Sequence, residues 1–179
     1  MSLTLRAPAS HLDWLRIRLL YRRAFPRNER KPFAIIRRMR REGRTDLWLA
    51  EQDGHFMGLA ATINAPDMVL LDYLAVHEKR RSQGVGSAML QALLNKYAGR
   101  GLFVEIEAAD RDDPDGSKLR RKQFYLRNGL DDMHVVAILF GVRMELLGRG
   151  CTLDFDVYRN FYRTYYSDWA AEHVVRPED

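Results

Sequence analysis

The sequence contains one cysteine among its 179 residues, Cys151, so the chain has no intramolecular disulfide. A single thiol suits a reducing compartment, and we expect a cytoplasmic protein. No apolar run approaches the length of a membrane-spanning helix, and residues 1–16 lack the apolar core of a signal peptide. The five histidines show no metal-ligand spacing. We therefore expect no membrane association and no bound metal.

Lysine is also scarce, since 5 of the 29 basic residues are lysines and the rest are arginines, for a net charge of +5. A basic excess can attract nucleic acid, anionic lipid or a phosphorylated small molecule, although a mixed surface accounts for an excess of this size. The densest basic run, residues 37–44, has no interleaved aromatic residues for stacking on bases. It reads as a solvated helix face, and we expect no nucleic-acid partner.

The sequence pattern predicts one domain of mixed α and β structure without repeats or linkers. Ser10 and Asp13 form a capping-box helix start, followed by three leucines (12, 15 and 19) at the spacing of a helix. Asp53-Gly54 between two apolar runs predicts a hairpin. The predicted strands are 3–9, 45–52, 55–63, 68–77, 102–108, 134–140 and 143–149, and the predicted helices are 10–25, 32–43, 84–97, 117–128 and 154–169.

The most informative segment is 73–90, where a buried strand ends at Val76 and glycines 84 and 86 open a helix. The first N–H groups of a helix have no intrahelical partner, and the helix dipole adds positive charge there, so the segment can cradle an anion. Arg80 and Arg81 add full charges. A plain strand–turn–helix corner would show the same glycine pair. The dinucleotide-binding fingerprint is excluded, because it needs glycine or alanine where Met89 stands.

Three segments together resemble the GNAT superfamily of N-acetyltransferases. Arg81, Gly84 and Gly86, with the preceding Leu-Ala-Val, resemble its acetyl-CoA motif, Gln/Arg-x-x-Gly-x-Gly/Ala. RRKQFYLRNGL (120–130) is similar to its FY-x-x-x-GF segment, with leucine in place of the last phenylalanine. AFPRNERKPF (24–33) resembles a segment of uncharacterised bacterial relatives that carry FP-x-x-ER. The resemblance covers most of residues 3–150 and is nearly silent about the acceptor.

This resemblance implies an α/β fold of the GNAT type, a mixed twisted sheet with helices on both faces. It places the acetyltransferase domain in residues 1–150 and leaves a C-terminal aromatic helix in 151–179, packed on that domain or on a partner subunit in a homodimer. It implies acetyl-CoA as cofactor, with loop N–H groups on the pyrophosphate and the strand end paired with the pantetheine arm. The residues implied in cofactor binding are Leu74, Ala75, Val76, Arg81, Ser82, Gln83, Gly84, Val85, Gly86 and Ser87.

The resemblance further implies direct attack of a primary amine on acetyl-CoA in a ternary complex. Tyr125 matches the family tyrosine proposed to protonate the departing thiolate, and the alternative is a core aromatic residue. Glu105 and Glu107 lie two apart on a strand and so share one face, which is either a solvated edge or part of a cleft. We favour Glu107 as the base that deprotonates the amine, while Glu105 and Asp72 remain alternative bases or acceptor-binding groups.

The acceptor is predicted to be a small-molecule or protein amine carrying positive charge. Asn28, Glu29 and Arg30 lie between the first two helices, where this fold contacts the acceptor, but a helix-capping surface cluster explains them equally well. The aspartates at 110, 112, 113 and 115 would attract a cation, or they form a solvated turn. An aromatic stripe on the last helix predicts packing, or a wall of the acceptor cleft. Its members are Tyr158, Phe161, Tyr162, Tyr165 and Trp169.

Two other functions remain open. A non-catalytic module that binds CoA would keep the fold without turning acetyl-CoA over, and the presence of Tyr125 and the carboxylates argues against it. An RNA-binding protein would lose affinity steeply with added salt and would not respond to acetyl-CoA. Turnover of acetyl-CoA with a panel of amines separates these alternatives.

Overall fold

The computed structural model describes residues 3–27, 29–109 and 113–178. The chain forms two compact units, the first made of Met1–Asn64 and Leu71–Ala98 and the second of Ala65–Leu70 and Gly99–Asp179. Strand β4 (Met68–Val76) belongs to both, since its first residues lie in the second unit and its remainder in the first. Among the described residues, no helix has the length and apolar character needed to span a membrane.

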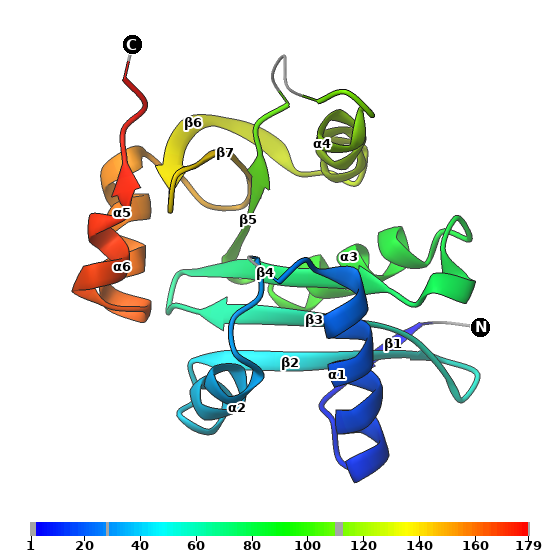
Figure 1. The fold of residues 1–179 in the computed structure, drawn as a ribbon. Helices are drawn as coiled ribbons and strands as arrows, with labels where there is room; N and C mark the ends of the chain where they lie inside the picture. Colours follow the sequence, from blue (N-terminus) through cyan, green and yellow to red (C-terminus); the bar gives the residue numbers. More distant parts are fainter. Residues whose placement is uncertain (1–2, 28, 110–112, 179) are drawn as a thin grey trace. The chain divides into compact units, whose positions relative to one another are not determined.

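The first unit is built on a sheet of strand order β1-β2-β3-β4. Strand β1 (Thr4–Arg6) pairs antiparallel with β2 (Thr45–Gln52), and β2 pairs antiparallel with β3 (His55–Asn64). Asp53 and Gly54 turn between them with φ of 52° and 75°, which confirms the predicted hairpin. Helices α1 (His11–Ala24) and α2 (Phe33–Arg41) cover one face of this sheet, and α3 (Val85–Lys96) covers the other (Figure 1).

Helix α1 begins as predicted but buries a different face. The Ser10 side chain accepts a hydrogen bond from the Asp13 N–H, and the Asp13 carboxylate accepts one from the Ser10 N–H. Asp13 also pairs with Arg6 at 2.7 Å, so this polar residue points toward the sheet. The face that follows it at helical spacing, Ile17 and Tyr21, is therefore buried. The leucines that predicted the helix are exposed, with exposed fractions of 52%, 52% and 45% for Leu12, Leu15 and Leu19.

The core of the first unit lies between α1, α2 and the sheet. On the opposite face, Gly58 of β3 allows α3 to approach closely. A Cβ atom at Gly58 would lie 2.4 Å from the Ala75 carbonyl oxygen and 2.8 Å from the Met89 sulfur. Because no other residue fits this space, Gly58 fixes how α3 packs on strands β3 and β4. The buried residues of α3 are Val85, Met89, Leu90 and Leu93, whereas Ala88 is exposed.

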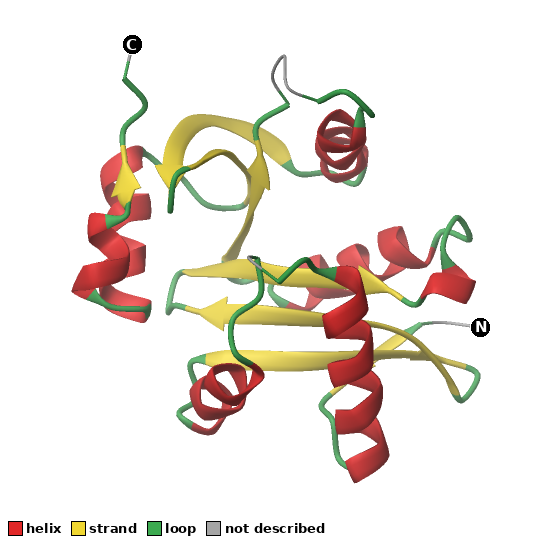
Figure 2. Cartoon of the chain, viewed as in Figure 1, coloured by secondary structure: helices red, strands yellow, loops and turns green. Residues whose placement is uncertain are grey.

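The second unit contains a sheet of strand order β4-β5-β7-β6-β8. Met68–Leu70 of β4 pair in parallel with Gly101–Phe103 of β5 (Gly101–Glu107). Three antiparallel pairings follow, β5 with β7 (Val142–Arg149), β7 with β6 (Asp131–Leu139), and β6 with the short β8 (Val174–Val175). Helix α4 (Ser117–Arg127) follows β5 in sequence (Figure 2).

The C-terminal helix predicted for 154–169 is two helices, α5 (Phe155–Tyr165) and α6 (Asp168–Glu172). Helix α5 ends at its C-cap residue, Tyr166. Ser167 is the N-cap of α6, and its side chain accepts a hydrogen bond from the Ala170 N–H. Helix α5 packs its aromatic face on β5, where the rings of Tyr158 and Phe161 lie 6.5 and 5.2 Å from the Phe103 ring. Trp169 does not share that face, because it lies on α6 and is 63% exposed.

We predict that Asp13→Asn lowers the free energy of unfolding by about 1–3 kcal/mol, because it removes the capping carboxylate and one of the two carboxylate partners of Arg6, the other being Glu51. The Arg6 guanidinium and the backbone N–H groups of Ala9 and Ser10 lower the pKa of Asp13. The stabilisation is therefore complete above about pH 4, the pKa of an unfolded aspartate, and is lost as the pH falls below that value. Urea denaturation from pH 7 to pH 2 measures both effects.

The control is Asp156→Asn, which removes an acidic residue from the first turn of another helix, α5. Its carboxylate is 79% exposed, so a change below about 0.5 kcal/mol is expected. Equal destabilisation by the two substitutions would contradict the assigned role of Asp13.

Candidate functional site

The loop before α3 has the backbone geometry of an anion-binding site. Gly84 is the N-cap residue with φ 77°, and Ser82 is also left-handed with φ 59°. No side chain caps the helix, and its first intrahelical bond is donated by the Ala88 N–H to the Gly84 carbonyl. The N–H groups of Val85, Gly86 and Ser87 precede that bond. Alternating handedness of this kind turns successive N–H groups toward one point, where an anion binds.

The side chains of this loop do not occupy the cradle. Arg81, Ser82, Gln83 and Gly84 are exposed, and the Gln83 amide donates to the Lys79 carbonyl oxygen at 3.1 Å. Space around Gly84 is open, since a Cβ there would have no neighbour within 4 Å. The loop can therefore present its N–H groups to a ligand without moving a side chain.

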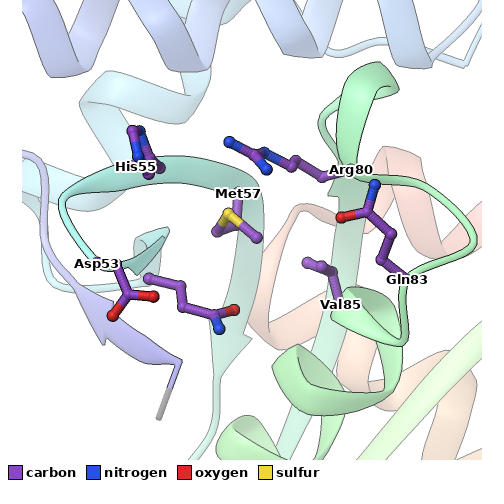
Figure 3. Close-up of a pocket in the computed structure, with 7 residues that line it drawn as sticks. Asp53, His55, Met57, Arg80, Gln83 and Val85 are labelled. Atoms are coloured by element: carbon purple, nitrogen blue, oxygen red, sulfur yellow. The ribbon is translucent and has the colours of Figure 1, made fainter. Parts of the chain in front are cut away.

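A small pocket of about 190 Å³ lies beside the loop (Figure 3). Arg80 and Gln83 line it from the loop, and His55 and Asp53 line it from the β2–β3 hairpin. Its apolar lining comes from Met57 and Val85, both buried. The pocket shows that the hairpin adds charged and polar groups next to the N–H groups of the loop.

The end of β4 alternates between two faces. Leu74 and Val76 are half-buried, while Ala75 between them is buried. Asp72 shares the face of Leu74 and Val76. The β4 backbone leads directly into η1 (Glu78–Arg80) and then into the loop.

Asp72 has a structural partner that the sequence did not indicate. Both of its carboxylate oxygens accept hydrogen bonds from the Lys31 ammonium, at 2.6 and 2.7 Å, and its side chain is 9% exposed. The Tyr73 hydroxyl donates to the Glu29 carbonyl oxygen and accepts from the Lys31 N–H, and the Tyr21 hydroxyl donates to the Lys31 carbonyl oxygen. This network binds the segment between α1 and α2 to the sheet.

The three acceptor-binding residues predicted in that segment differ in what the structure describes of them. Asn28 lies outside the described residues. Glu29 is exposed and is held through its backbone by Tyr73. Arg30 is half-buried, and its Nε atom is buried without a hydrogen-bond partner in the part of the chain that the structure describes.

In the second unit, Glu105 and Glu107 share one face of β5, while Val104 and Ile106 are buried on the other. Glu105 accepts hydrogen bonds from the hydroxyls of Tyr158 and Tyr162 on α5. Glu107, by contrast, forms an ion pair with Lys118 of α4 at 3.5 Å. The two carboxylates therefore contact different helices, although they lie two residues apart.

Tyr125 lies in the last turn of α4, two residues before the end of the helix. Its ring is half-buried and packs edge-on against Phe124 at 5.1 Å. Desolvation raises the pKa of its hydroxyl to about 12. Among the described residues the hydroxyl has no hydrogen-bond partner, so its proton is available to a ligand.

The acidic turn before α4 includes two residues with structural roles. Asp113 accepts hydrogen bonds from the N–H groups of Lys118 and Leu119, and Asp115 accepts one from Ser117. These contacts cap α4 and favour the interpretation as a solvated turn. Asp110 and Asp112 lie outside the described residues. Within the described ranges, no three histidine, cysteine or acidic side chains are grouped as metal ligands would be.

Comparison with known proteins places these features in a family. Residues 14–129 match the acetyltransferase (GNAT) family. YjbC of Bacillus subtilis (strain 168), by name an acetyltransferase, is 30% identical over 103 residues. That match covers 58% of this chain and 50% of YjbC, so the chain corresponds to about half the length of that relative.

Solved structures of acetyltransferases share the fold. A GNAT-family protein from Bacteroides thetaiotaomicron superposes with a TM-score of 0.76 at 16% identity, covering 93% of this chain and 98% of that one. An aminoglycoside 6′-N-acetyltransferase in complex with coenzyme A gives a TM-score of 0.63 at 13% identity, covering 83% and 96%. At these identities the likeness shows the fold alone, a mixed α/β sheet with flanking helices, as the sequence predicted.

Proposed function

Because the chain belongs to the acetyltransferase (GNAT) family, we propose that it transfers an acetyl group from acetyl-CoA to a primary amine. The observation that supports this proposal most directly is the uncapped start of α3, with Ser82 and Gly84 left-handed and the N–H groups of Val85, Gly86 and Ser87 lacking intrahelical partners. Such a loop binds the charge of a pyrophosphate through its backbone.

The residues present fit acetyl-CoA. The loop from Arg81 to Ser87 would hold the pyrophosphate, with the exposed Arg81 adding charge, and the backbone of Leu74–Val76 would pair with the pantetheine arm. Bound there, acetyl-CoA supplies the thioester whose carbonyl carbon the amine attacks. The amine nitrogen forms a bond to this carbon, the carbon–sulfur bond breaks, and the thiolate leaves.

Glu107 and Tyr125 are the groups we propose for the two proton transfers. Glu107, which forms a partially exposed ion pair with Lys118, accepts the proton that the amine must lose. Tyr125, protonated at all working pH values because its pKa is about 12, offers its hydrogen to the departing thiolate. No covalent enzyme intermediate is needed.

We propose a cationic acceptor, a small-molecule or protein amine, on the basis of Glu105 and Glu107 of β5. The segment between α1 and α2 has mixed charge, with Glu29 followed by Arg30 and Lys31. Glu29 and Arg30 of that segment remain candidates for acceptor contacts, whereas Asp72 is engaged with Lys31. The alternative function, a CoA-binding module without catalysis, predicts cofactor binding but no release of CoA thiol with any amine.

We predict that Gly84→Asp abolishes acetyl-CoA binding. The substitution places a carboxylate beside the N–H groups and forces a side chain into a left-handed conformation. Isothermal titration calorimetry with acetyl-CoA measures the loss. Gly43→Asp is the matched control, because Gly43 has φ 72° and equally open surroundings, so it reports backbone strain alone. Equal affinities of the wild type and Gly84→Asp for acetyl-CoA would show that the loop does not bind the cofactor.

Tyr125→Phe should fold and bind acetyl-CoA normally, yet lower kcat by about 100-fold, the lower end of the range for general acid catalysis. The lower end is expected because a hydroxyl with a pKa of about 12 is a weak acid. Single-turnover rates of acetyl transfer isolate the chemical step. An unchanged single-turnover rate would exclude Tyr125 from proton donation.

Glu107→Gln is expected to lower kcat by about 100-fold or more and to leave acetyl-CoA affinity unchanged, because the amide cannot take the proton of the amine. Release of CoA thiol in the presence of an amine panel gives kcat and KM. Asp115→Asn is the control, since Asp115 is a helix-capping carboxylate of the neighbouring turn and should alter neither constant. Full activity of Glu107→Gln would show that another group acts as the base.

A further inference from the structure

The pocket beside the loop contains a basic side chain that no described residue neutralises. Arg80 of η1 is half-buried, and its side chain extends across the pocket toward His55 of the β2–β3 hairpin (Figure 3). Within residues 3–27, 29–109 and 113–178, neither side chain forms a hydrogen bond, an ion pair or a ring contact. Arginine is always charged, and burying a charge without a partner is costly. Arg80 therefore offers its guanidinium to a ligand.

The acidic residue of the lining, Asp53, lies apart from Arg80. The two side chains form no ion pair with each other, and Figure 3 shows Asp53 beyond Met57 as seen from Arg80. Asp53 is exposed in the hairpin turn, so water and salt screen its charge. The basic groups thus lie at one end of the pocket and the acidic group at the other.

The pocket is open to solvent and has room for a polyatomic ligand. Its rim includes the exposed residues His55, Asp53 and Gln83, while Met57 and Val85, each 5% exposed, form its apolar floor. Its volume is about 190 Å³, whereas a single water needs about 10–15 Å³. A ligand can therefore enter past the rim without moving a buried side chain.

The polar groups of the pocket suit a phosphate monoester. A guanidinium presents a planar pair of N–H groups to two phosphate oxygens, and the imidazole N–H of His55 can donate to a third. The half-buried amide of Gln52, which has no partner among the described residues, adds another donor. A carboxylate carries one charge and two oxygens, so it would satisfy Arg80 and leave the other donors unused. A phosphate monoester carries about two charges at neutral pH and has oxygens for all three groups.

The pocket adjoins the proposed cofactor loop through Val85. The side chain of Val85 lines the pocket, and its N–H is one of the donors at the start of α3. Gln83, which also lines the pocket, directly precedes the N-cap residue Gly84. A ligand in the pocket therefore lies next to the pyrophosphate expected at the loop. CoA carries a phosphate monoester on the same ribose that bears its pyrophosphate.

We propose that this pocket, through Arg80, His55 and Gln52, is a binding site for a phosphate monoester. The phosphate belongs either to the ribose of CoA, a source that rests on the proposed function, or to a separate phosphorylated molecule that binds beside the cofactor. With the first source, the hairpin makes the protein prefer CoA over dephospho-CoA. With the second, the pocket takes an additional ligand of the protein.

The first experiment compares two ligands that differ only by this phosphate. Calorimetry measures binding of CoA and of dephospho-CoA to the full chain in its wild-type, Arg80→Gln, His55→Gln and Asp53→Asn forms. Asparagine at position 53 accepts the left-handed backbone of the turn, where φ is 52°. Lys79→Gln is the matched control, because it removes an equal charge from an exposed neighbouring residue that does not line the pocket. Melting temperatures check that each variant folds.

The second experiment uses inorganic phosphate as the probe for a separate ligand. The NMR signals of the His55 ring, identified by their absence from the His55→Gln protein, report phosphate binding in the pocket. Sodium chloride at equal ionic strength controls for the screening of charges.

We expect the wild type to bind CoA at least about 10-fold more tightly than dephospho-CoA, because charge-assisted hydrogen bonds hold the additional phosphate. Arg80→Gln should weaken CoA binding about 10- to 100-fold and abolish this preference, and His55→Gln should reduce the preference several-fold. Asp53→Asn should strengthen CoA binding about twofold, because it removes a repulsive charge that is only partly screened. Lys79→Gln should change the preference by less than about twofold.

Equal binding of CoA and dephospho-CoA by the wild type, together with a phosphate effect on His55 that Arg80→Gln abolishes, would assign the pocket to a separate phosphorylated ligand. Equal binding without that effect would overturn the proposal, as would equal losses in Arg80→Gln and Lys79→Gln. If neither CoA nor dephospho-CoA binds while phosphate still shifts the His55 signals, the proposed cofactor fails and the phosphate site stands.

Discussion

The start of α3 offers hydrogen-bond donors that the protein itself does not satisfy, and the proposed chemistry depends on this deficit. A serine or aspartate at the N-cap would fill the position with its own side chain, whereas Gly84 leaves it open. Gly58 allows Met89 to pack on the sheet and thereby fixes α3 against strands β3 and β4. The direction of the N–H groups is thus set by the core, and the exposed side chains of the loop contribute charge but not geometry.

Features determined by neighbouring residues could be predicted from the sequence. The hairpin at Asp53-Gly54, the capping box at Ser10 and the helix after Gly84 each depend on a few consecutive residues. The buried face of α1 could not be predicted in the same way. Its leucines suggested one face, but Asp13 turned another toward the sheet, because Arg6 in a different element neutralises it. The break before α6 had a local signal, the N-cap Ser167, which the aromatic periodicity concealed.

The contacts of the candidate site depend on pairs that are distant in sequence, and no local pattern reveals them. Lys31 reaches Asp72 across 41 residues, and Tyr162 reaches Glu105 across 57. The aromatic stripe of the last helix correctly indicated packing, yet the pattern does not show that its hydroxyls point at a carboxylate. The residue types identify the groups that could transfer protons or bind ligands. The residues that contact each group decide its role, and only the structure shows those contacts.

The two carboxylates of β5 differ in the side chains that contact them. Glu107 forms a partially exposed ion pair with Lys118 of α4. Glu105 instead accepts hydrogen bonds from two buried phenols of α5, which fix the orientation of its carboxylate. Tyr125 is the group proposed to act on the departing thiolate, and burial raises the pKa of its hydroxyl to about 12. Full transfer from a phenol with a pKa of about 12 to a thiolate of about 8.5 is unfavourable by roughly 5 kcal/mol. Proton donation by Tyr125 is therefore completed only when its phenolate regains the proton that Glu107 has accepted from the amine, which offsets this cost.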